Sequence, residues 1–549
     1  MARYDVVLIH PPSLYDFRKK IWFPGPIDRT VPNYTAVFLM FPIGLISIGS
    51  YLQEHGIRTK VVNIAEKMVI DRDLDIERFL QELESQIYGI DLHWSVHSQG
   101  AVKITEICKR YHPDSTIVVG GLTATCFDRE IVSEFRSIDC VVRGEAEEPL
   151  LQLAENIGET DDFKKAPNLT FLDKRGKVVR NRSLKPVESL DHYDFTRLDI
   201  VEPNMRTLTS PYTGSRLWNL PICRGCAFNC ATCGGSNYSY RKLLNREKPA
   251  FRSPQKLHED LMILDEQGVS QVFLFQDPRI GGDKYVKQIL DILRGARWSS
   301  IKSIGMELFT PADRSFIKSI VEARIADYVG LSISPESGTE YTRRMHGRDY
   351  SNDELLRTCE YCRELNIPLG VFFLSGVGYE TSETLQYMWK LWNEIFSVEK
   401  RIRGRYRIYV DCGPMIFLDS GSLAFDFPER YGYKLRFKNF RDYFQAMGLP
   451  HWSQWISYET VNMSGLDLAN SILESLDVLL QLKREHGRIT EKEYRRERLN
   501  LDLDKIFVSD FVEIMKIENP NERNARVKEL AEIAKDPLLS LSYIQTQGK

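Results

Sequence analysis

Short apolar runs alternate with amphipathic stretches along most of this 549-residue chain, and the alternation occurs in two series. The first series begins with YDVVLIH at residues 4–10 and continues to CVVRGEAEEPL at residues 140–150. The second runs from LWNLPI at residues 217–222 to YRIYVDCG at residues 406–413. Strands that alternate with helices form βαβ units around a parallel sheet. We therefore expect an α/β protein with two such sheets.

Length and turn residues divide the chain further. A chain of 549 residues exceeds what one hydrophobic core usually serves. Pro186, Pro203 and Pro211 lie in a turn-rich stretch between the two series, and long amphipathic helices follow the second. The expected parts are an open Rossmann-like domain (1–180), a linker (181–215), a six-stranded βα domain (216–420) and a mainly helical C-terminal domain (421–549).

Composition and charge argue against several classes of protein. Hydrophobic residues make up 43% and charged residues 27%, which is ordinary for a soluble globular protein. The formal net charge of −3 gives no electrostatic argument for nucleic acid or an anionic membrane. No stretch approaches the roughly 18 uninterrupted apolar residues of a membrane span, and the N-terminus lacks a signal-peptide pattern. We therefore expect a cytoplasmic protein with no nucleic acid partner and no integral membrane span.

Three cysteines have the spacing CxxxCxxC, namely Cys226, Cys230 and Cys233. Thiolates suit iron–sulfur chemistry, and this set leaves one iron of a four-iron four-sulfur cluster without a protein ligand. Zinc sites favour repeated CxxC pairs with a further ligand, and no second pair lies at a convincing spacing. Ten cysteines in 549 residues are too sparse for a secreted disulfide scaffold. Cys223 makes a CxxC with Cys226, so a shifted set of Cys223, Cys226 and Cys230 stays open.

The cysteine loop resembles the signature of the radical S-adenosylmethionine (SAM) superfamily. Members of this superfamily bind the amino acid end of SAM at the open iron and reduce it to a 5′-deoxyadenosyl radical. The resemblance implies a four-iron four-sulfur cluster on Cys226, Cys230 and Cys233, with SAM as a second cofactor. It also implies that the second series is a partial (β/α)6 barrel with its active site at the carboxyl ends of the strands. An external electron donor of the flavodoxin or ferredoxin type is implied as a partner.

Polar residues after three strands of the second series resemble SAM-contacting elements of this family. Asp277 follows QVFLF and is a candidate partner for the SAM ammonium. Ser334 and Glu336 lie in SISPESG, which resembles the family's ESG element near the SAM ribose or methionine. The turn SGVGYET resembles the GxPGET turn near the adenine, but Gly378 and Tyr379 replace its usual proline and glycine. The backbone path of that turn therefore stays open.

The first series resembles the cobalamin-binding domain that precedes the barrel in many radical SAM enzymes. The resemblance lies in HPPS at residues 10–13, VGGLTAT at residues 119–125 and VVRGEAEEPL at residues 141–150. Doubly wound sheets bind ligands in such loops, and glycines let the backbone pass close to a flat corrin ring. The alternative is a Rossmann-like domain that binds no corrinoid. The residues implied to contact cobalamin are Pro11, Pro12, Ser13, Gly120, Gly121, Thr123, Thr125, Gly144 and Glu145.

No histidine is expected on the cobalt. Methionine-synthase-type cobalamin domains carry DxHxxG, whereas DLHWSV at residues 91–96 has no glycine in place and follows the third strand rather than the first. We interpret His93 and His97 as satisfied polar groups that line a cleft or an interface. His10 ends the first strand and is not assigned as a ligand.

Two further groups of residues allow two interpretations each. Cys359 and Cys362 lie three apart on an expected helix and could form a redox pair or hold an auxiliary cluster, but helix-core packing is favoured. Trp452, Trp455 and Tyr458 could face a substrate from a helical cap over the barrel mouth, or could simply pack in the core.

Finer resemblances suggest the reaction. HPPSLYDF at residues 10–17, GIDLHW at 89–94 and CGGSNYSY at 233–240 resemble a subgroup with pyrrole C-methyltransferases of aminocoumarin antibiotic pathways and archaeal proteins that build rings in tetraether lipids. The first hypothesis is a cobalamin-dependent radical SAM methyltransferase that acts on a carbon of a small, largely apolar or aromatic substrate. The alternative is a radical SAM enzyme that forms a carbon–carbon bond or a ring without methyl transfer. A third is a non-catalytic corrinoid or iron–sulfur protein.

Overall fold

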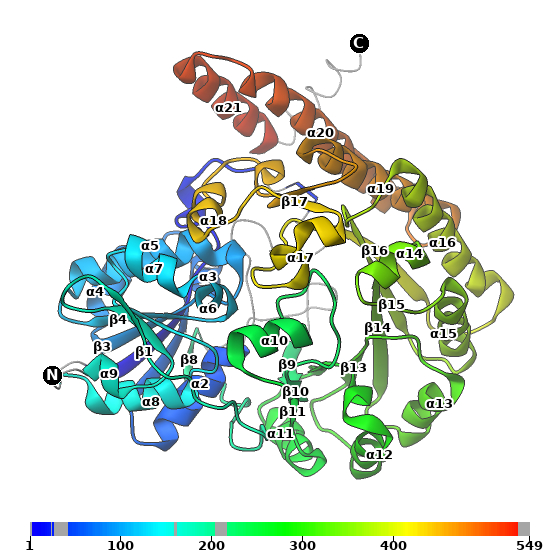
Figure 1. Cartoon of the computed structure of the whole chain (residues 1–549). Coiled ribbons are helices and arrows are strands. Elements are labelled where there is room, and N and C mark those ends of the chain that lie inside the picture. Colours follow the sequence, from blue (N-terminus) through cyan, green and yellow to red (C-terminus); the bar gives the residue numbers. More distant parts are fainter. Residues whose placement is uncertain (1–2, 24, 27–41, 159–161, 204–216, 536–549) are drawn as a thin grey trace.

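Two parallel sheets form two lobes that lie side by side (Figure 1). The structure is a computed structural model and describes residues 3–23, 25–26, 42–158, 162–203 and 217–535. Residues 204–215 of the expected linker lie outside the described residues.

The first sheet has the strand order β7-β6-β5-β4-β3-β1-β2-β8. Its strands are parallel except for β6 and β7, which run antiparallel to their neighbours. The order reverses between β1 and β3, because β2 and β3 lie on opposite sides of β1. The strands are β1 (Tyr4–His10), β2 (Thr59–Asn63), β3 (Ser85–Asp91), β4 (Thr116–Gly120), β5 (Cys140–Val142), β6 (Leu169–Leu172), β7 (Val178–Arg180) and β8 (Val201–Glu202).

Helices cover both faces of this sheet. Val6 and Leu8 of β1 pack in one core with α2 and α8, while Val7 and Ile9 pack in another with α3 to α7. A strand that is buried on both faces reads as a continuous apolar run, which explains YDVVLIH. The helices are α2 (Ile43–Glu54), α3 (Ile64–Ile70), α4 (Ile76–Glu82), α5 (Ser98–Tyr111), α6 (Leu122–Cys126), α7 (Asp128–Glu134), α8 (Glu147–Asn156) and α9 (Asp162–Lys165).

The second sheet contains six strands in the order β16-β15-β14-β13-β12-β9, and all neighbours are parallel. Its strands are β9 (Leu217–Pro221), β12 (Gln271–Phe275), β13 (Ser303–Leu308), β14 (Tyr328–Glu336), β15 (Leu369–Ser375) and β16 (Ile408–Pro414). Helices α11 to α13, α15 and α16 lie along its outer side (Figure 1). This arrangement confirms the expected partial (β/α)6 barrel.

Shorter elements complete the barrel and position its active-site loops. A small antiparallel pair of β10 (Cys223–Arg224) and β11 (Ala250–Phe251) follows the first barrel strand. The helices of this region are α10 (Asn237–Leu244), α11 (Pro254–Glu266), α12 (Gly282–Ile292), α13 (Arg314–Ala323), α14 (Glu340–Met345), α15 (Asn352–Glu364) and α16 (Ser382–Arg401). Several begin with a side-chain cap, as in α15, where Ser351 and Glu354 form a capping box.

The C-terminal part is mainly helical, as expected, and contacts both lobes. Its α18 packs beside α5 of the first lobe through Phe440 and Tyr443, and α19 packs against α16 and β16. None of the helices in the described ranges has the length and hydropathy of a membrane span. The elements are α17 (Leu423–Asp426), β17 (Tyr433–Leu435), α18 (Phe440–Ala446), β18 (Tyr458–Thr460), α19 (Gly465–Glu485), α20 (Glu491–Met515) and α21 (Pro520–Lys535).

An N-terminal segment reaches this C-terminal part. The Phe23 amide donates a hydrogen bond to the Pro450 carbonyl at 2.6 Å, and the Phe23 carbonyl accepts one from the Trp452 amide at 3.1 Å. The Phe23 ring lies 5.8 Å from the ring of Phe507 and 6.3 Å from that of Phe511. Residues from opposite ends of the sequence thus share one small core.

Candidate active site

The motif cysteines lie on the loop between β10 and α10. Cys226 and Cys230 are buried, and Cys233 is half-buried. The Phe228 amide donates to the Cys226 sulfur and the Gly235 amide to the Cys233 sulfur, each at 3.3 Å. Hydrogen bonds to the sulfurs are among the features that tune a protein-bound cluster. The donor set and its backbone amides therefore fit a four-iron four-sulfur cluster.

Cys223 is held differently. It lies on β10, pairs through its backbone with β11, and its thiol lies 3.7 Å from the Gly225 carbonyl oxygen. Burial raises the pKa of this thiol well above its ordinary value. Within the described ranges no three Cys, His, Asp or Glu side chains converge as ligands of a single metal ion. A cluster does not need such convergence, because each thiolate binds a different iron. The ligand set therefore stays a prediction.

Three buried acceptor atoms at the carboxyl ends of barrel strands have no hydrogen-bond partner among the described residues. They are Oε1 of Gln276 after β12, Oε2 of Glu336 at the end of β14 and Oγ of Ser375 at the end of β15. Buried polar atoms in native proteins are nearly always paired, so this group indicates a ligand. The ammonium and ribose hydroxyls of SAM are donors and would pair with such acceptors. The mouth of the barrel therefore fits SAM.

Arg348 lies beside the cysteines and the motif glutamate. Its Nε donates to Oε1 of Glu336 at 2.8 Å. Burial alone would lower the pKa of Arg348, but the charges of Glu336 and Cys230 outweigh it and raise that pKa further. The sequence alone did not single out Arg348. The only sign of it there is a basic residue twelve positions after Glu336.

The other two predicted SAM contacts differ in their surroundings. Asp277 is buried and accepts hydrogen bonds from Nη2 of Arg279 at 2.6 Å and from the Phe309 amide at 2.8 Å. Its assignment to the SAM ammonium stays a prediction, because Arg279 already neutralises the carboxylate. Ser334 is half-buried on β14, two residues before Glu336.

The turn after β15 takes a defined path despite its unusual residues. Glu380 closes it by accepting a hydrogen bond from the Gly376 amide at 2.7 Å. Gly376 and Tyr379 have positive φ angles of 94° and 65°. A Cβ atom on Gly378 would lie 2.0 Å from the Tyr431 carbonyl oxygen, so only glycine fits there.

The loops predicted to bind cobalamin meet at the carboxyl edge of the first sheet. The Gly144 amide donates to Oγ1 of Thr125 at 2.9 Å, which joins the loop after β5 to α6, the short helix after β4. Oγ1 of Thr123, also on α6, donates to the His93 carbonyl in the loop after β3 at 3.0 Å. All nine predicted residues lie at or after the carboxyl ends of β1, β4 and β5: Pro11, Pro12, Ser13, Gly120, Gly121, Thr123, Thr125, Gly144 and Glu145. Their contacts with a corrinoid stay predictions.

A histidine and an aspartate meet where the strand order reverses. Nδ1 of His10 lies 2.9 Å from Oδ2 of Asp91, and Nε2 of His10 is buried without a partner in the described part of the chain. The His97 ring is buried 4.9 Å from the His10 ring, whereas His93 is exposed. Open sheets bind ligands at this reversal, and an unpaired polar atom there fits an amide-bearing corrinoid.

A short segment after β16 touches both candidate cofactor sites. Oδ2 of Asp419 accepts a hydrogen bond from the Gly234 amide, next to Cys233, at 2.8 Å. Oγ of Ser420 lies 3.1 Å from Oγ of Ser95, which follows β3 of the first lobe. The cluster loop and the cobalamin-site loops therefore border the same segment.

The C-terminal aromatic residues are part of the core. Trp452, Trp455 and Tyr458 are 1%, 2% and 0% exposed, so none of them presents a surface to a substrate. The Tyr458 hydroxyl lies 2.7 Å from the carbonyl oxygens of Gly376 and Met415, at the ends of β15 and β16. These rings therefore pack in the core where the C-terminal part contacts the ends of β15 and β16.

Cys359 and Cys362 on α15 are both fully buried, as the packing interpretation expects. Burial raises the pKa of the Cys359 thiol to about 12 and that of the Cys362 thiol well above its ordinary value. Buried thiols with such pKa values are unreactive.

Comparison with known families assigns the two lobes. Residues 30–154 match the B12 binding domain, and residues 220–390 match the radical SAM superfamily. The chain is therefore a radical SAM protein with an N-terminal B12-binding domain. The first domain implies cobalamin as a cofactor, and the second implies SAM and a four-iron four-sulfur cluster.

Curated relatives are distant and carry different names. An anaerobic magnesium-protoporphyrin IX monomethyl ester cyclase from Rubrivivax gelatinosus is 22% identical over 317 residues, which cover 53% of this chain and 52% of the relative. An uncharacterized methyltransferase from Pyrococcus horikoshii is 22% identical over 413 residues, which cover 68% and 81%. A hopanoid C-3 methylase from Methylococcus capsulatus is 21% identical over 241 residues, which cover 43% of each chain. The chain spans about half the length of the cyclase.

Two solved structures share the whole architecture. The radical SAM methyltransferase TsrM from Kitasatospora setae, with cobalamin and a [4Fe-4S] cluster bound, has a TM-score of 0.59 at 15% identity and covers 98% of this chain and 100% of its own. The cobalamin-dependent SAM radical enzyme OxsB, with aqua-cobalamin bound, has a TM-score of 0.56 at 12% identity and covers 97% and 76%. At these identities the likeness concerns the fold.

Proposed function

We propose that the protein is a cobalamin-dependent radical SAM methyltransferase, which moves a methyl group from SAM to a carbon of a small, largely apolar or aromatic substrate. The observation that carries this proposal is the segment at Asp419 and Ser420, which touches the cluster loop on one side and a cobalamin-site loop on the other. A substrate beside this segment would be within reach of both cofactors. The methyltransferase and methylase names among the relatives add support.

The cofactors supply the reactive groups when bound: SAM and the cluster a 5′-deoxyadenosyl radical, and cobalamin a methyl group. The chain's own residues hold and orient them. Cys226, Cys230 and Cys233 would bind the cluster and leave one iron for the amino acid end of SAM. At that end, Oε2 of Glu336 is available to the ammonium, and the Arg348 guanidinium is available to the carboxylate.

The loops of the first lobe would hold the corrinoid by shape. Glycines after β4 and β5 allow close approach of the backbone, and the buried Nε2 of His10 offers a polar contact for a corrin amide. Exclusion of water from the site would protect a substrate radical from side reactions.

The second candidate is a radical SAM enzyme that closes a ring or forms a carbon–carbon bond. The cyclase relative from Rubrivivax gelatinosus is the specific observation in its favour. Both candidates use the same cysteines and SAM contacts, so only the products distinguish them.

An anaerobic assay with methyl-labelled SAM and reconstituted protein distinguishes the two. Methyl transfer predicts labelled product with deoxyadenosine and S-adenosylhomocysteine in comparable amounts. Deoxyadenosine with an unlabelled, cyclised or dehydrogenated product, and no S-adenosylhomocysteine, would overturn the proposal in favour of ring formation. Absence of SAM cleavage would instead support a non-catalytic binding protein. The assay uses a flavodoxin or ferredoxin as reductant, in keeping with our proposal of a cytoplasmic enzyme with such an external donor.

A further inference from the structure

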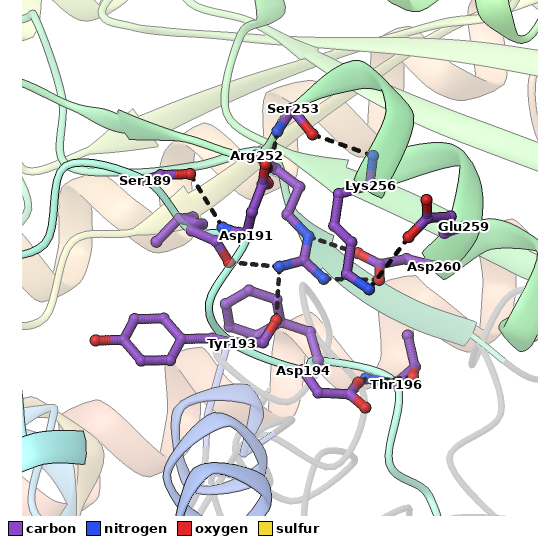
Figure 2. Close-up of polar contacts among 12 residues, drawn as sticks. Ser189, Asp191, Tyr193, Asp194, Thr196, Arg252, Ser253, Lys256, Glu259 and Asp260 are labelled. Atoms are coloured by element: carbon purple, nitrogen blue, oxygen red, sulfur yellow. Dashed lines mark hydrogen bonds and ion pairs between the residues drawn. The ribbon is translucent and has the colours of Figure 1, made fainter. Parts of the chain in front are cut away.

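The segment that leaves the first lobe is fixed to the barrel by one buried arginine. Arg252 precedes α11, and its guanidinium donates twice to the Asp260 carboxylate, at 2.7 Å each, and to the Leu190 and Tyr193 carbonyls (Figure 2). Ser253 extends this anchor through its amide, which donates to the Asp191 carboxylate at 2.8 Å. Residues 189–196 are thus attached to the start of a barrel helix.

A second buried connection starts at the loop after β5. Glu147 is 2% exposed, and its Oε1 accepts hydrogen bonds from Nη2 of Arg224 and Oγ of Ser47, each at 2.7 Å. Burial raises the pKa of Glu147, but the Arg224 charge and these hydrogen bonds outweigh it, so that the pKa lies below its ordinary value. The pair is therefore ionised and joins the two lobes.

A neighbouring carboxylate repeats this connection. Glu145 accepts a hydrogen bond from Nε of Arg246 at 2.9 Å, and its Oε2 lies 3.5 Å from Nη1 of Arg224. Arg246 is 4% exposed and fills the space above Gly225, where a Cβ atom would lie 2.9 Å from its Cδ. We call Glu145, Glu147, Arg224 and Arg246 the interdomain ion-pair network.

The network lies next to the predicted cluster site. Arg224 is the last residue of β10 and lies two positions before Cys226. The arginine also lies over the ring of Tyr193, 5.1 Å from its centroid, and Tyr193 accepts a hydrogen bond from Arg252 through its carbonyl. Of the carboxylates that hold Arg224, Glu145 follows Gly144 in the loop after β5 and Glu147 begins α8. The Gly144 amide is bonded to Thr125 at the carboxyl edge of the first sheet, where cobalamin is predicted to bind.

We infer that Glu147 and Arg224 are positioning residues that set the separation and orientation of the cobalamin edge relative to the cluster. The inference rests on the proposed function, because methyl transfer requires one substrate carbon to reach both cofactors. Radical formation needs only the barrel, whereas methyl transfer to the substrate needs the two lobes in the correct relative position. A misplacement of about 1 Å costs on the order of 10²-fold in rate. Loss of this network should therefore uncouple SAM cleavage from product formation.

The test uses full-length protein reconstituted anaerobically with cluster and cobalamin, in the wild type and in Glu147→Gln. Product formed per deoxyadenosine is expected to fall about tenfold or more in the variant, while SAM cleavage stays within about twofold. Independently of turnover, the cobalt(II) electron paramagnetic resonance signal should relax faster when the cluster is reduced. This effect should weaken in Glu147→Gln, because it depends on the distance between the two centres.

Asp128→Asn is the matched control. Asp128 is also buried and paired with arginine, at 2.9 Å from Nε of Arg180, but both residues belong to the first lobe. The control should keep the wild-type ratio of product to deoxyadenosine and the faster cobalt(II) relaxation on reduction of the cluster. If Glu147→Gln does not hold its cofactors, the double variant Glu147→Gln, Arg224→Gln leaves no unpaired buried charge and should show the same uncoupling.

Three outcomes overturn the inference. The first is that variants that hold both cofactors keep the wild-type ratio of product to deoxyadenosine and the wild-type relaxation of the cobalt(II) signal. The others are that Asp128→Asn loses as much of both as Glu147→Gln does, or that the reduced cluster does not affect cobalt(II) relaxation in the wild type. A wild type that makes only unmethylated product contradicts the proposed methyl transfer instead. The relaxation measurement still tests the positioning role in that case.

Discussion

Glu336 and Arg348 form an ion pair of 2.8 Å at the mouth of the barrel, and the second carboxylate oxygen of Glu336 has no partner in the described residues. Glu336 has a positive φ of 66°, an uncommon backbone conformation for a side-chain-bearing residue. Such conformations cluster at binding sites, where the surrounding structure holds them. The pair offers one acceptor and one cation to a ligand beside Cys230.

Replacing Arg348 with methionine should weaken SAM binding. Charge-assisted hydrogen bonds contribute about 1.5–3 kcal/mol, so Kd for SAM is expected to rise about 10- to 150-fold. Equilibrium dialysis with the reconstituted protein measures this change. Arg344→Met is the control, because Arg344 lies four residues earlier and is exposed. Equal affinities in Arg348→Met and the wild type would reject the assignment.

Replacing Cys226, Cys230 and Cys233 together with alanine should remove the visible iron–sulfur absorption and abolish reductive SAM cleavage. The reason is that these thiolates are the expected protein ligands of the cluster. Iron analysis and deoxyadenosine formation measure the outcome, with Cys359→Ala as a control that keeps the cluster. If Cys223→Ala loses the cluster while Cys233→Ala keeps it, the shifted ligand set is correct instead.

Gly100→Ala should weaken cobalamin binding. A Cβ atom at this position of α5 would lie 1.7 Å from the Pro12 carbonyl oxygen, so the HPPS loop must move. Overpacking of this kind costs about 1–3 kcal/mol, and each 1.4 kcal/mol lost from binding corresponds to about tenfold in Kd. Dialysis with hydroxocobalamin measures the effect. Gly44→Ala in α2, where a Cβ atom meets nothing within 4 Å, should bind as the wild type does.

The cobalt(II) form of the bound cofactor should show no nitrogen splitting from a protein imidazole. The segment DLHWSV at residues 91–96 lacks the glycine of the DxHxxG motif, and Nδ1 of His10 is already held 2.9 Å from Oδ2 of Asp91. Electron paramagnetic resonance tests this expectation. Nitrogen splitting that disappears in His10→Ala or His93→Ala would show that a histidine binds cobalt.

Glu380→Gln should change how stability depends on pH. Burial raises the pKa of Glu380 from 4.5 to about 8 in the folded protein, although backbone amides of Gly376 and Val377 favour its charged form. Between these values the folded state binds the extra proton, so stability falls as pH rises, by up to ~1.4 kcal/mol per pH unit. Glutamine keeps the hydrogen bond from Gly376 without the charge.

Thermal unfolding at several pH values measures this difference. The variant should be more stable than the wild type at pH 8 and should differ little near pH 4.5. Glu383→Gln, at an exposed position three residues later in α16, should follow the wild type. Parallel stability curves for Glu380→Gln and the wild type would contradict the expectation.

Local patterns explain what the sequence predicted. YDVVLIH is an apolar run that becomes a buried strand because helices cover both faces of its sheet. QVFLF becomes a barrel strand whose residues alternate between buried and half-buried, because helices lie along the outer side of that sheet. The cysteine spacing needs no distant partner, which is why Cys226, Cys230 and Cys233 could be singled out. Domain boundaries stay predictions, and β8 at Val201–Glu202 pairs with β2 from within the expected linker.

The residues that sequence reasoning missed depend on distant contacts. Arg224 meets Glu147 across 77 positions and Arg246 meets Glu145 across 101, and no local periodicity marks such pairs. Gln276 contributes to the site only because β12 and β14 end at the same mouth. The sequence left two interpretations open for Trp452, because its packing involves Phe23, a residue more than 400 positions earlier whose carbonyl accepts a hydrogen bond from the Trp452 amide.

The contact between Phe23 and the C-terminal part has a consequence for biosynthesis. During translation, Phe23 leaves the ribosome long before Pro450, Phe507 and Phe511 are made. The nascent first lobe must therefore carry an uncovered aromatic side chain until synthesis is almost finished. A truncated chain that ends before α20 would lack Phe507 and Phe511 and leave Phe23 without these two aromatic partners. Such exposed apolar groups promote aggregation.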